Sequence, residues 1–310
     1  MLIEWCGEFA GRWMRWKKTV ARPADYYAGM FGSHLSISGG MHNALLKAEE
    51  LGFDCVQVFT KNQQQWKCSP LGDEVVGSWR SHCDRLGFEQ TVSHDSYLIN
   101  LASPDETLRN KSIALFVEEL SRCAALGIRY LVTHPGAHVG DGEEIGLRRV
   151  AKSLDEVHAT VRAGGVITCL EITAGQGSSL GYKLEHLAEI MSQVKAPERL
   201  GVCLDTAHLF AAGYDFRGRK YAGFCREVER TVGLKQVKVL HLNDSKKDLG
   251  SRVDRHEHIG RGKIGLDGFR PIVRDRRFAK VPKILETAKE KDEQGREWDA
   301  VNLEVLRSLV

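Results

Sequence analysis

The chain has 310 residues, of which 42% are hydrophobic and 27% are charged. This composition is typical of a folded globular protein and excludes a disordered or fibrous chain. The formal net charge is only +3, so any affinity for a polyanion has to come from local clusters of Lys and Arg. The length fits one α/β barrel of roughly 250 residues with an extension.

The cysteines and the apolar runs indicate the compartment. None of the eight cysteines forms a C-x-x-C pair, and most stand in apolar stretches. They are therefore predicted to be reduced core residues, and a thiolate zinc site is not expected. No apolar run approaches the ~18 residues of a membrane span, and no secretory h-region is present. The sequence predicts a soluble cytoplasmic protein that does not bind membranes.

The first 27 residues differ from the remainder. Their apolar residues alternate at spacings of four and three, which predicts an amphipathic helix packed against the barrel or a partner. Organelle targeting is the less favoured alternative, because acidic Glu4 and Glu8 fall within the first ten residues. Another alternative is that Met30 is the true start. We therefore divide the chain into an extension, 1–27, and a catalytic domain, 28–310.

From about residue 28, short β-rich runs alternate with longer helical patterns in eight units. The predicted strands are Met30–Leu35, Cys55–Thr60, Gln90–His94, Tyr130–His134, Val166–Ile172, Leu200–Asp205, Val237–Leu242 and Lys283–Glu286. The predicted helices are Met41–Leu51, Asp73–Leu86, Pro104–Leu126, Gly142–Ala163, Lys183–Val194, Arg219–Val232, Leu266–Asp275 and Trp298–Leu309. Several strands are continuously apolar, as expected when both faces of a sheet are buried. Eight such repeats without a Gly-rich dinucleotide motif favour a closed (β/α)8 TIM barrel over an open sheet.

Polar residues able to bind metal fall at the ends of these strands. The set comprises His34, His94, His134, Glu171, Asp205, His208, His241, His256 and Glu286. In a barrel all parallel strands end on one face, so these side chains should converge. A single His at a strand end is more often a hydrogen-bonded structural residue. The joint pattern favours metal, because an apolar strand such as VITCLEI has little reason to bury Glu171 without a cation. Imidazole and carboxylate ligands suit Zn²⁺ or Mn²⁺.

Seven local motifs in colinear order extend this pattern. They are HDSYLINLASP at 94–104, THPGAH at 133–138, LEITAGQGSSLGYKLEHL at 170–187, GVCLDTAHLFAAGYD at 201–215, HLNDSK at 241–246, GSRVDRHEHIGRGKIG at 250–265 and LET at 285–287. Together they closely resemble the endonuclease IV family over roughly residues 28 to 290. The resemblance implies a xylose-isomerase-like TIM barrel and a DNA-repair deoxyribonuclease that cuts 5′ to abasic sites, leaving a 3′-hydroxyl and a 5′-deoxyribose phosphate.

The resemblance further implies three zinc ions per chain, with Mn²⁺ possible at one site. One ion would be held by His94, His134 and Glu171; a second by Glu171, Asp205, His241 and Glu286; the third by His208, Asp254 and His256. Glu286 and Glu171 are the expected catalytic carboxylates. Of the other histidines, His34, His138 and His258 are interpreted as loop residues or neighbours of ligands, and His42, His82, His158 and His186 as solvent-facing helix residues.

Recognition of double-stranded DNA is expected from the rim of the barrel. The resemblance places Tyr97 and Leu98 as a wedge that enters the base stack; the alternative is two ordinary loop hydrophobics. Gln64 stands where the family usually has Arg, so DNA affinity should be reduced. Lys61 and Arg255 are predicted phosphate contacts, together with the other basic residues of 246–263, although a merely solvated loop is an alternative. The protein is expected to act as a monomer associated with the nucleoid.

Two other functions remain open on the sequence alone. A metal-dependent sugar isomerase or epimerase on the same barrel would use Glu171, Asp205, His241 and Glu286, and would leave the other histidines unexplained. A non-catalytic metal- or DNA-binding protein is the third alternative. Counting the bound metal separates the first two, because the nuclease should hold about three ions and the isomerase one.

Overall fold

The computed structural model of the protein describes residues 29–161 and 165–310. The predicted amphipathic helix of residues 1–27 lies outside these residues. Within the described ranges no helix combines the length and apolar character needed to cross a membrane.

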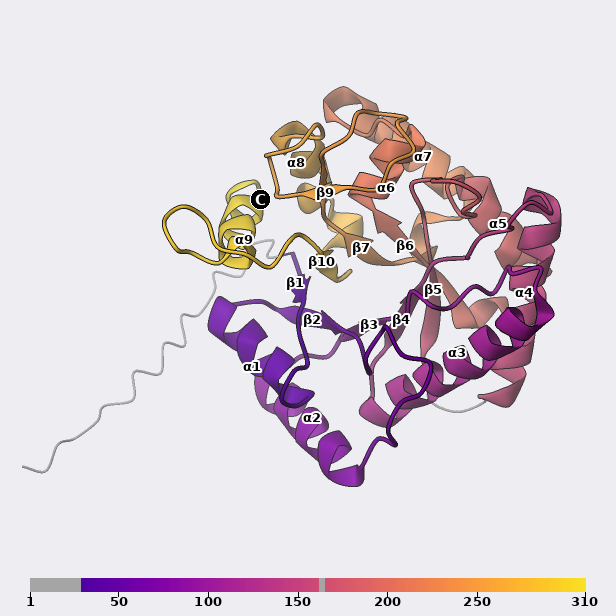
Figure 1. Cartoon of the computed structure of the whole chain (residues 1–310). Coiled ribbons are helices and arrows are strands. Elements are labelled where there is room, and N and C mark those ends of the chain that lie inside the picture. Colours follow the sequence, from indigo (N-terminus) through magenta and orange to yellow (C-terminus); the bar gives the residue numbers. More distant parts are fainter. Residues whose placement is uncertain (1–28, 162–164) are drawn as a thin grey trace, which may run out of the picture.

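Eight parallel strands close into a barrel in the order β1-β10-β7-β6-β5-β4-β3-β2, with helices around it (Figure 1). The barrel strands are β1 Phe31–His34, β2 Cys55–Val58, β3 Val92–His94, β4 Tyr130–Thr133, β5 Ile167–Glu171, β6 Leu200–Asp205, β7 Val237–His241 and β10 Lys283–Leu285. Each strand falls inside a predicted strand. The predicted (β/α)8 barrel is confirmed.

The eight predicted helices are present with shifted ends. They are α1 His42–Leu51, α2 Asp73–Leu86, α3 Glu106–Leu126, α4 Glu143–Thr160, α5 Leu184–Gln193, α7 Tyr221–Thr231, α8 Leu266–Arg274 and α9 Trp298–Ser308. Helix α3 shows why the ends shift. It begins two residues after Pro104, because the Asp105 side chain accepts hydrogen bonds from the amides of Thr107 and Leu108. It ends where Gly127 adopts φ +75°.

Several short elements were not predicted. Helix α6, Thr206–Ala212, follows β6 without a loop. Strands β8, Asp244–Ser245, and β9, His256–Glu257, pair antiparallel above the barrel. Four 3₁₀ turns complete the described elements: Pro197–Arg199, Gly218–Lys220, Leu234–Gln236 and Arg276–Phe278.

The barrel interior is built in two layers. The lower layer, which we call the floor, is an apolar cluster containing Cys55, Val92, Val132, Cys169, Cys203, Val239 and Ile284. Side chains alternate along a strand, so the residue two positions further on points into the same interior. Those positions form the second layer, which we call the polar layer. It consists of Gln57, His94, His134, Glu171, Asp205, His241 and Glu286, with His34 from β1.

Gly32 takes the place of a floor side chain on β1. A Cβ atom there would lie 2.7 Å from the carbonyl oxygen of Cys55 and 2.8 Å from Ile284 Cδ1, so the floor has room only for glycine. A second, larger apolar cluster fills the space between the strands and the surrounding helices. The two clusters together fix the strand ends that carry the polar layer.

The seven described cysteines are free thiols, and all but the half-buried Cys68 and Cys83 are buried. The five buried cysteines are core residues, as predicted. The prediction that His158 and His186 face solvent is wrong, because each is only 5% exposed. His158 Nε2 lies 3.1 Å from Thr168 Oγ1, and His186 accepts from the Gly181 amide. Both rings lie on the barrel side of their helices. His42 and His82 are half-buried and stack at 5.1 Å.

Candidate metal centre

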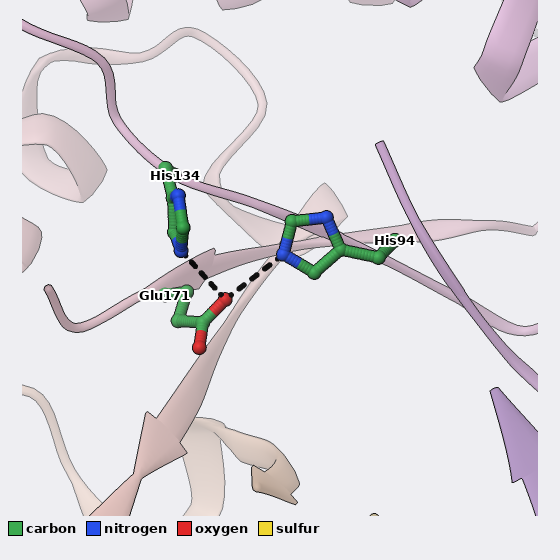
Figure 2. Close-up of side chains that lie close together, drawn as sticks. All are labelled: His94, His134 and Glu171. Atoms are coloured by element: carbon green, nitrogen blue, oxygen red, sulfur yellow. Dashed lines mark hydrogen bonds and ion pairs between the residues drawn. The ribbon is translucent and has the colours of Figure 1, made fainter. Parts of the chain in front are cut away.

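Glu171 lies at the centre of the polar layer. Its Oε2 is 3.1 Å from His94 Nε2 and 3.2 Å from His134 Nε2 (Figure 2). Its other oxygen is 2.9 Å from His241 Nδ1 and 3.3 Å from His208 Nδ1. The carboxylate is fully buried. Strand β5 therefore places one carboxylate among four imidazoles that come from other parts of the barrel.

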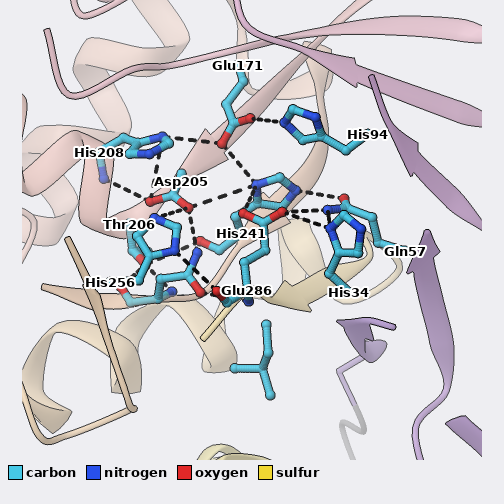
Figure 3. A network of polar contacts seen from close by, with 12 residues as sticks. His34, Gln57, His94, Glu171, Asp205, Thr206, His208, His241, His256 and Glu286 are labelled. Carbon is cyan, nitrogen blue, oxygen red and sulfur yellow. Dashed lines mark hydrogen bonds and ion pairs between the residues drawn. The ribbon is translucent and has the colours of Figure 1, made fainter. Parts of the chain in front are cut away.

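Eight of the nine predicted ligand residues come together in three overlapping groups. Within each group the candidate donor atoms lie within 4.8 Å of one another: His94, His134 and Glu171; Glu171, Asp205, His241 and Glu286; and Asp205, His208 and His256. Asp254 adjoins the last group, 3.1 Å from His208 Nε2 and 3.2 Å from His256 Nε2. Figure 3 shows most of this network at the mouth of the barrel.

Backbone carbonyls fix which nitrogen two of these rings offer. His94 Nδ1 lies 2.9 Å from the Asp95 carbonyl, and His208 Nδ1 lies 2.9 Å from the Ile172 carbonyl. A carbonyl only accepts, so each Nδ1 carries a proton and donates it. When the ring is neutral, Nε2 carries the lone pair and can bind a metal, which is the usual arrangement of a metal-binding histidine.

Two other rings carry buried nitrogens that are free to bind a cation. The Nε2 atoms of His134 and His256 are buried and have no hydrogen-bond partner in the described part of the chain. His134 Nε2 nevertheless lies only 3.2 Å from Glu171 Oε2. Two ligands bound at about 2.1 Å in a tetrahedral arrangement lie about 3.4 Å apart. The separation and the unpartnered nitrogens both fit donor atoms that share a metal ion.

Opposite charges in the site shift the pKa values of its histidines and carboxylates. Burial lowers the pKa of His94, but the hydrogen bond and charge of Glu171 outweigh it and raise that pKa to about 9. Burial likewise opposes protonation of His256, whose pKa is raised to about 9 by Asp205 and Asp254. Burial would raise the pKa of Glu171, but His241 and His134 hold it well below its usual range. Protons thus occupy the positions where cations would bind, and metal binding should release them.

Asp205 is held by two neighbours in the position it takes. Its Oδ1 accepts from the His208 amide at 2.8 Å, which caps helix α6, and its Oδ2 accepts from Asn243 Nδ2 at 2.6 Å. Asn243 Oδ1 in turn accepts from the Glu286 amide at 2.8 Å. Asn243 was missed from the sequence, although it stands two residues after His241 in the HLNDSK motif. It connects the strand ends that carry Asp205, His241 and Glu286.

Three more residues lie beside the proposed ligands without having been predicted as ligands. Gln57 and His34 contact Glu286, at 2.6 Å and 3.4 Å, and neither belongs to the nine. Cys203 Sγ lies within 4.8 Å of donor atoms of Glu171 and His241. Burial raises the pKa of the Cys203 thiol, so it stays protonated and belongs to the floor.

The predicted DNA-contacting residues differ in how far they are exposed. Tyr97 is 66% exposed, with its ring 5.7 Å from those of Phe59 and His94. Leu98 is half-buried, and Gln64 and Arg255 are exposed. All four are accessible at least in part.

The prediction that Lys61 contacts phosphate does not fit its position. The side chain is buried, and its Nζ donates to the carbonyls of Asn62 at 2.8 Å and Gln65 at 2.7 Å. Nζ also lies 3.9 Å from Glu119 Oε1. The ammonium therefore holds its own loop together and is not available at the surface.

An eight-stranded parallel barrel with imidazoles and carboxylates at its strand ends belongs to a class of metal-binding barrels. In agreement, the family model described as "Xylose isomerase-like TIM barrel" matches residues 45–309. A protein of Chloroflexus aurantiacus named "Probable endonuclease 4" is 52% identical over 281 residues, covering 90% of this chain and 98% of the relative. The chain belongs to the endonuclease IV family.

Solved structures agree with this assignment. Endonuclease IV from Thermus thermophilus matches with a TM-score of 0.80 and 35% identity, covering 90% of this chain and 98% of that one. A D-tagatose 3-epimerase-like protein matches with a TM-score of 0.68 at 20% identity, covering 90% of this chain and 96% of that one. The second likeness shows the shared fold alone.

Proposed function

We propose that the chain hydrolyses the phosphodiester 5′ to an abasic site in double-stranded DNA, using three Zn²⁺ ions held by the polar layer. Family membership makes the chain an AP endonuclease of DNA repair. The metal, its count, the cleavage products and the residue roles are the proposal. The observation that carries it is the convergence of nine imidazole and carboxylate side chains in overlapping groups.

We assign the ligands to the three ions as the sequence suggests. One ion would bind His94, His134 and Glu171, and a second would share Glu171 and bind Asp205, His241 and Glu286. The third would bind His208, Asp254 and His256, and this site is the one open to Mn²⁺. When bound, such ions act as Lewis acids toward phosphate oxygens and can lower the pKa of water from about 15.7 to about 7.

The charge of the site suits an anionic substrate. Three divalent ions carry six positive charges, and four carboxylates compensate four of them, leaving about two. Glu171 and Glu286 would orient the attacking water; their carboxylates lie in the polar layer, 2.9 and 3.0 Å from His241 Nδ1. The leaving 3′-oxygen would lie near His208, Asp254 and His256.

Recognition of the lesion falls to the rim. The exposed ring of Tyr97, supported by Phe59, and the adjacent Leu98 would enter the stack where a base is missing. Extruding a baseless nucleotide costs less than flipping a paired one, which itself favours the lesion.

Phosphate contacts would come from Arg255 and the exposed basic residues of the same loop. Buried Asp244 fixes this loop by accepting from the amides of Gly260, Gly262 and Ile264 at 2.9 to 3.0 Å. The exposed basic residues are Lys246, Lys247, Arg252, Arg261 and Lys263. Substrate affinity should fall with rising salt, with a slope set by the number of phosphates contacted.

The test is incision of a duplex that carries one abasic-site analogue, compared with the same duplex carrying an intact base. We expect a single cut 5′ to the lesion, loss of cutting after chelation, and recovery with Zn²⁺. Elemental analysis should find about three ions per folded chain; a single ion with sugar-epimerising activity would support the isomerase alternative instead. A Glu286→Gln variant that keeps its metals and full rate would remove Glu286 from the mechanism.

We also propose that the protein works as a monomer in the cytoplasm, associated with the nucleoid. The free thiols of the described cysteines are compatible with a reducing compartment. Light scattering of the purified protein, with and without DNA, tests the monomer.

A further inference from the structure

Gln57 occupies a position in the polar layer that no ligand assignment explains. It is fully buried, two residues after Cys55 on β2, and its amide contacts three side chains. Its Oε1 lies 2.8 Å from His241 Nε2, and its Nε2 lies 2.6 Å from Glu286 Oε1 and 2.9 Å from His34 Nδ1 (Figure 3). A neutral amide thus joins one proposed ligand histidine, one ligand carboxylate and one histidine outside the ligand set.

The orientation of the Gln57 amide is determined by Glu286. An ionised carboxylate only accepts hydrogen bonds, so the group 2.6 Å from Glu286 Oε1 must be the NH₂ of the amide. The flipped amide would place two oxygens in contact without a proton between them. The carbonyl oxygen of Gln57 therefore faces His241.

This orientation determines which nitrogen of His241 can bind a metal. The Gln57 oxygen can only accept, so His241 Nε2 carries a proton and donates it. The lone pair of the neutral ring is then on Nδ1, which lies 2.9 Å from Glu171 Oε1 and 3.0 Å from Glu286 Oε2. His241 is thus prepared to bind through Nδ1, whereas His94 and His208 present Nε2.

The same amide determines the tautomer of His34. One hydrogen of the Gln57 NH₂ goes to Glu286 and the other to His34 Nδ1, which must accept it. Neutral His34 therefore carries its proton on Nε2. That nitrogen has no hydrogen-bond partner within residues 29–161 and 165–310.

The His34 ring is held in place by its neighbour Phe59, whose ring lies 4.3 Å away. Its Nε2 is buried, so a proton fixed there lies inside the protein, beside the proposed metal centre.

We propose that Gln57 is a positioning residue with two effects: it selects Nδ1 as the ligating nitrogen of His241, and it fixes the proton of neutral His34 on Nε2. The first effect concerns metal binding, so the inference rests on the proposed function. It adds to that function two residues outside the nine ligands.

Zinc affinity tests the first effect. Gln57→Met keeps a side chain of similar length without hydrogen bonds, and Cys55→Ala on the same strand is the matched control in the floor. Competition with a chelator should show a 10- to 100-fold loss of zinc affinity in Gln57→Met, the range typical of groups that orient a metal ligand. Cys55→Ala should bind zinc as the natural chain does. A folded Gln57→Met variant with unchanged zinc affinity would overturn the role.

Ring nitrogen spectra test both tautomers directly. Long-range ¹H–¹⁵N correlations of the zinc-loaded chain should show His241 protonated at Nε2 and His34 protonated at Nε2. Gln57→Met removes the N–H that His34 Nδ1 accepts, so the His34 proton should move to Nδ1, which lies 3.4 Å from Glu286 Oε1. A wild-type His34 protonated at Nδ1 would overturn the inference. These two readouts need no DNA, so a protein that shows them but does not cut abasic DNA contradicts the proposed function and not the role of Gln57 in metal binding.

Discussion

The floor and the polar layer come from the same strands and the same side of the barrel wall, separated by two residues. The floor is closed by small and medium apolar side chains and has no polar function. The layer above it contains the carboxylates and imidazoles, with the charges of buried Glu171 and Asp205 opposed by histidines. On each strand, therefore, the residue that stabilises the barrel and the residue that can take part in chemistry are only two positions apart. Changes in the two layers should therefore have separable effects.

The largest effect should follow from removing the central charge of the polar layer. Glu171→Gln keeps the shape but removes the charge that faces four imidazoles, so bound zinc and incision should both fall. We expect a loss in incision rate well beyond the ~100-fold typical of groups that only orient a ligand. Zinc analysis and single-turnover cleavage measure it. A variant with full zinc and rate would remove Glu171 from the centre.

The matching change in the floor should affect stability alone. Ile284→Ala, two residues before Glu286, removes a fully buried side chain and should cost about 2–5 kcal/mol of unfolding free energy. Zinc stoichiometry at temperatures well below the midpoint should be unchanged. Urea unfolding with parallel zinc analysis separates the two. Loss of zinc without loss of stability would contradict the division into layers.

A buried histidine on the outer side of the barrel wall should make the stability of the protein depend on pH. His158 is buried against Thr168 on β5, and burial, followed by the charge of Arg199, lowers its pKa from 6.5 to about 4. Between these values the folded chain binds fewer protons than the unfolded chain, so stability falls as the pH falls from 6.5 toward 4. From pH 7 to pH 5 the loss from this group is about 2 kcal/mol.

His158→Leu should reduce that loss. Urea unfolding of the chelator-stripped protein at both pH values gives the difference, and stripping removes the competing titration of metal ligands. The same pH dependence in both proteins would show that His158 does not contribute.

The smallest effect should come from the rim, above both layers. Gln64→Arg adds an exposed charge and should tighten binding to an abasic duplex by a few-fold, with a salt slope steeper by about one. Gln193→Arg, near the end of α5 and thus at the opposite end of the barrel, is the matched control. Fluorescence anisotropy at several salt concentrations compares them. Equal gains in both variants would reflect net charge and not a contact at residue 64.

The sequence predicted the strands well because buried parallel strands are continuously apolar and end in polar residues. The nine proposed ligands were found because imidazoles and carboxylates at strand ends are chemically conspicuous. Gln57 was missed because an amide is not a usual ligand of Zn²⁺, although its position two residues after Cys55 carried the needed signal. His158 also had a signal, since it lies four residues after buried Leu154 on the inner face of α4.

Other features had no signal in a single sequence. The burial of Lys61 depends on the carbonyls of Asn62 and Gln65 turning toward its ammonium, which is a property of the folded loop. Helix α6 has only seven residues, which is too short for a helical period to stand out in the sequence, so it was not predicted.

The direct junction of β6 and α6 couples local folding to catalysis. Asp205 Oδ1 must point at the His208 amide to start the helix, and that same rotation turns Oδ2 into the barrel mouth. Because the first turn of α6 also delivers the His208 ring, one backbone event supplies two donors at once. A chain in which this turn fails to form would lose two of its nine proposed metal ligands in a single step, so the metal content of the protein should depend on whether this short helix forms.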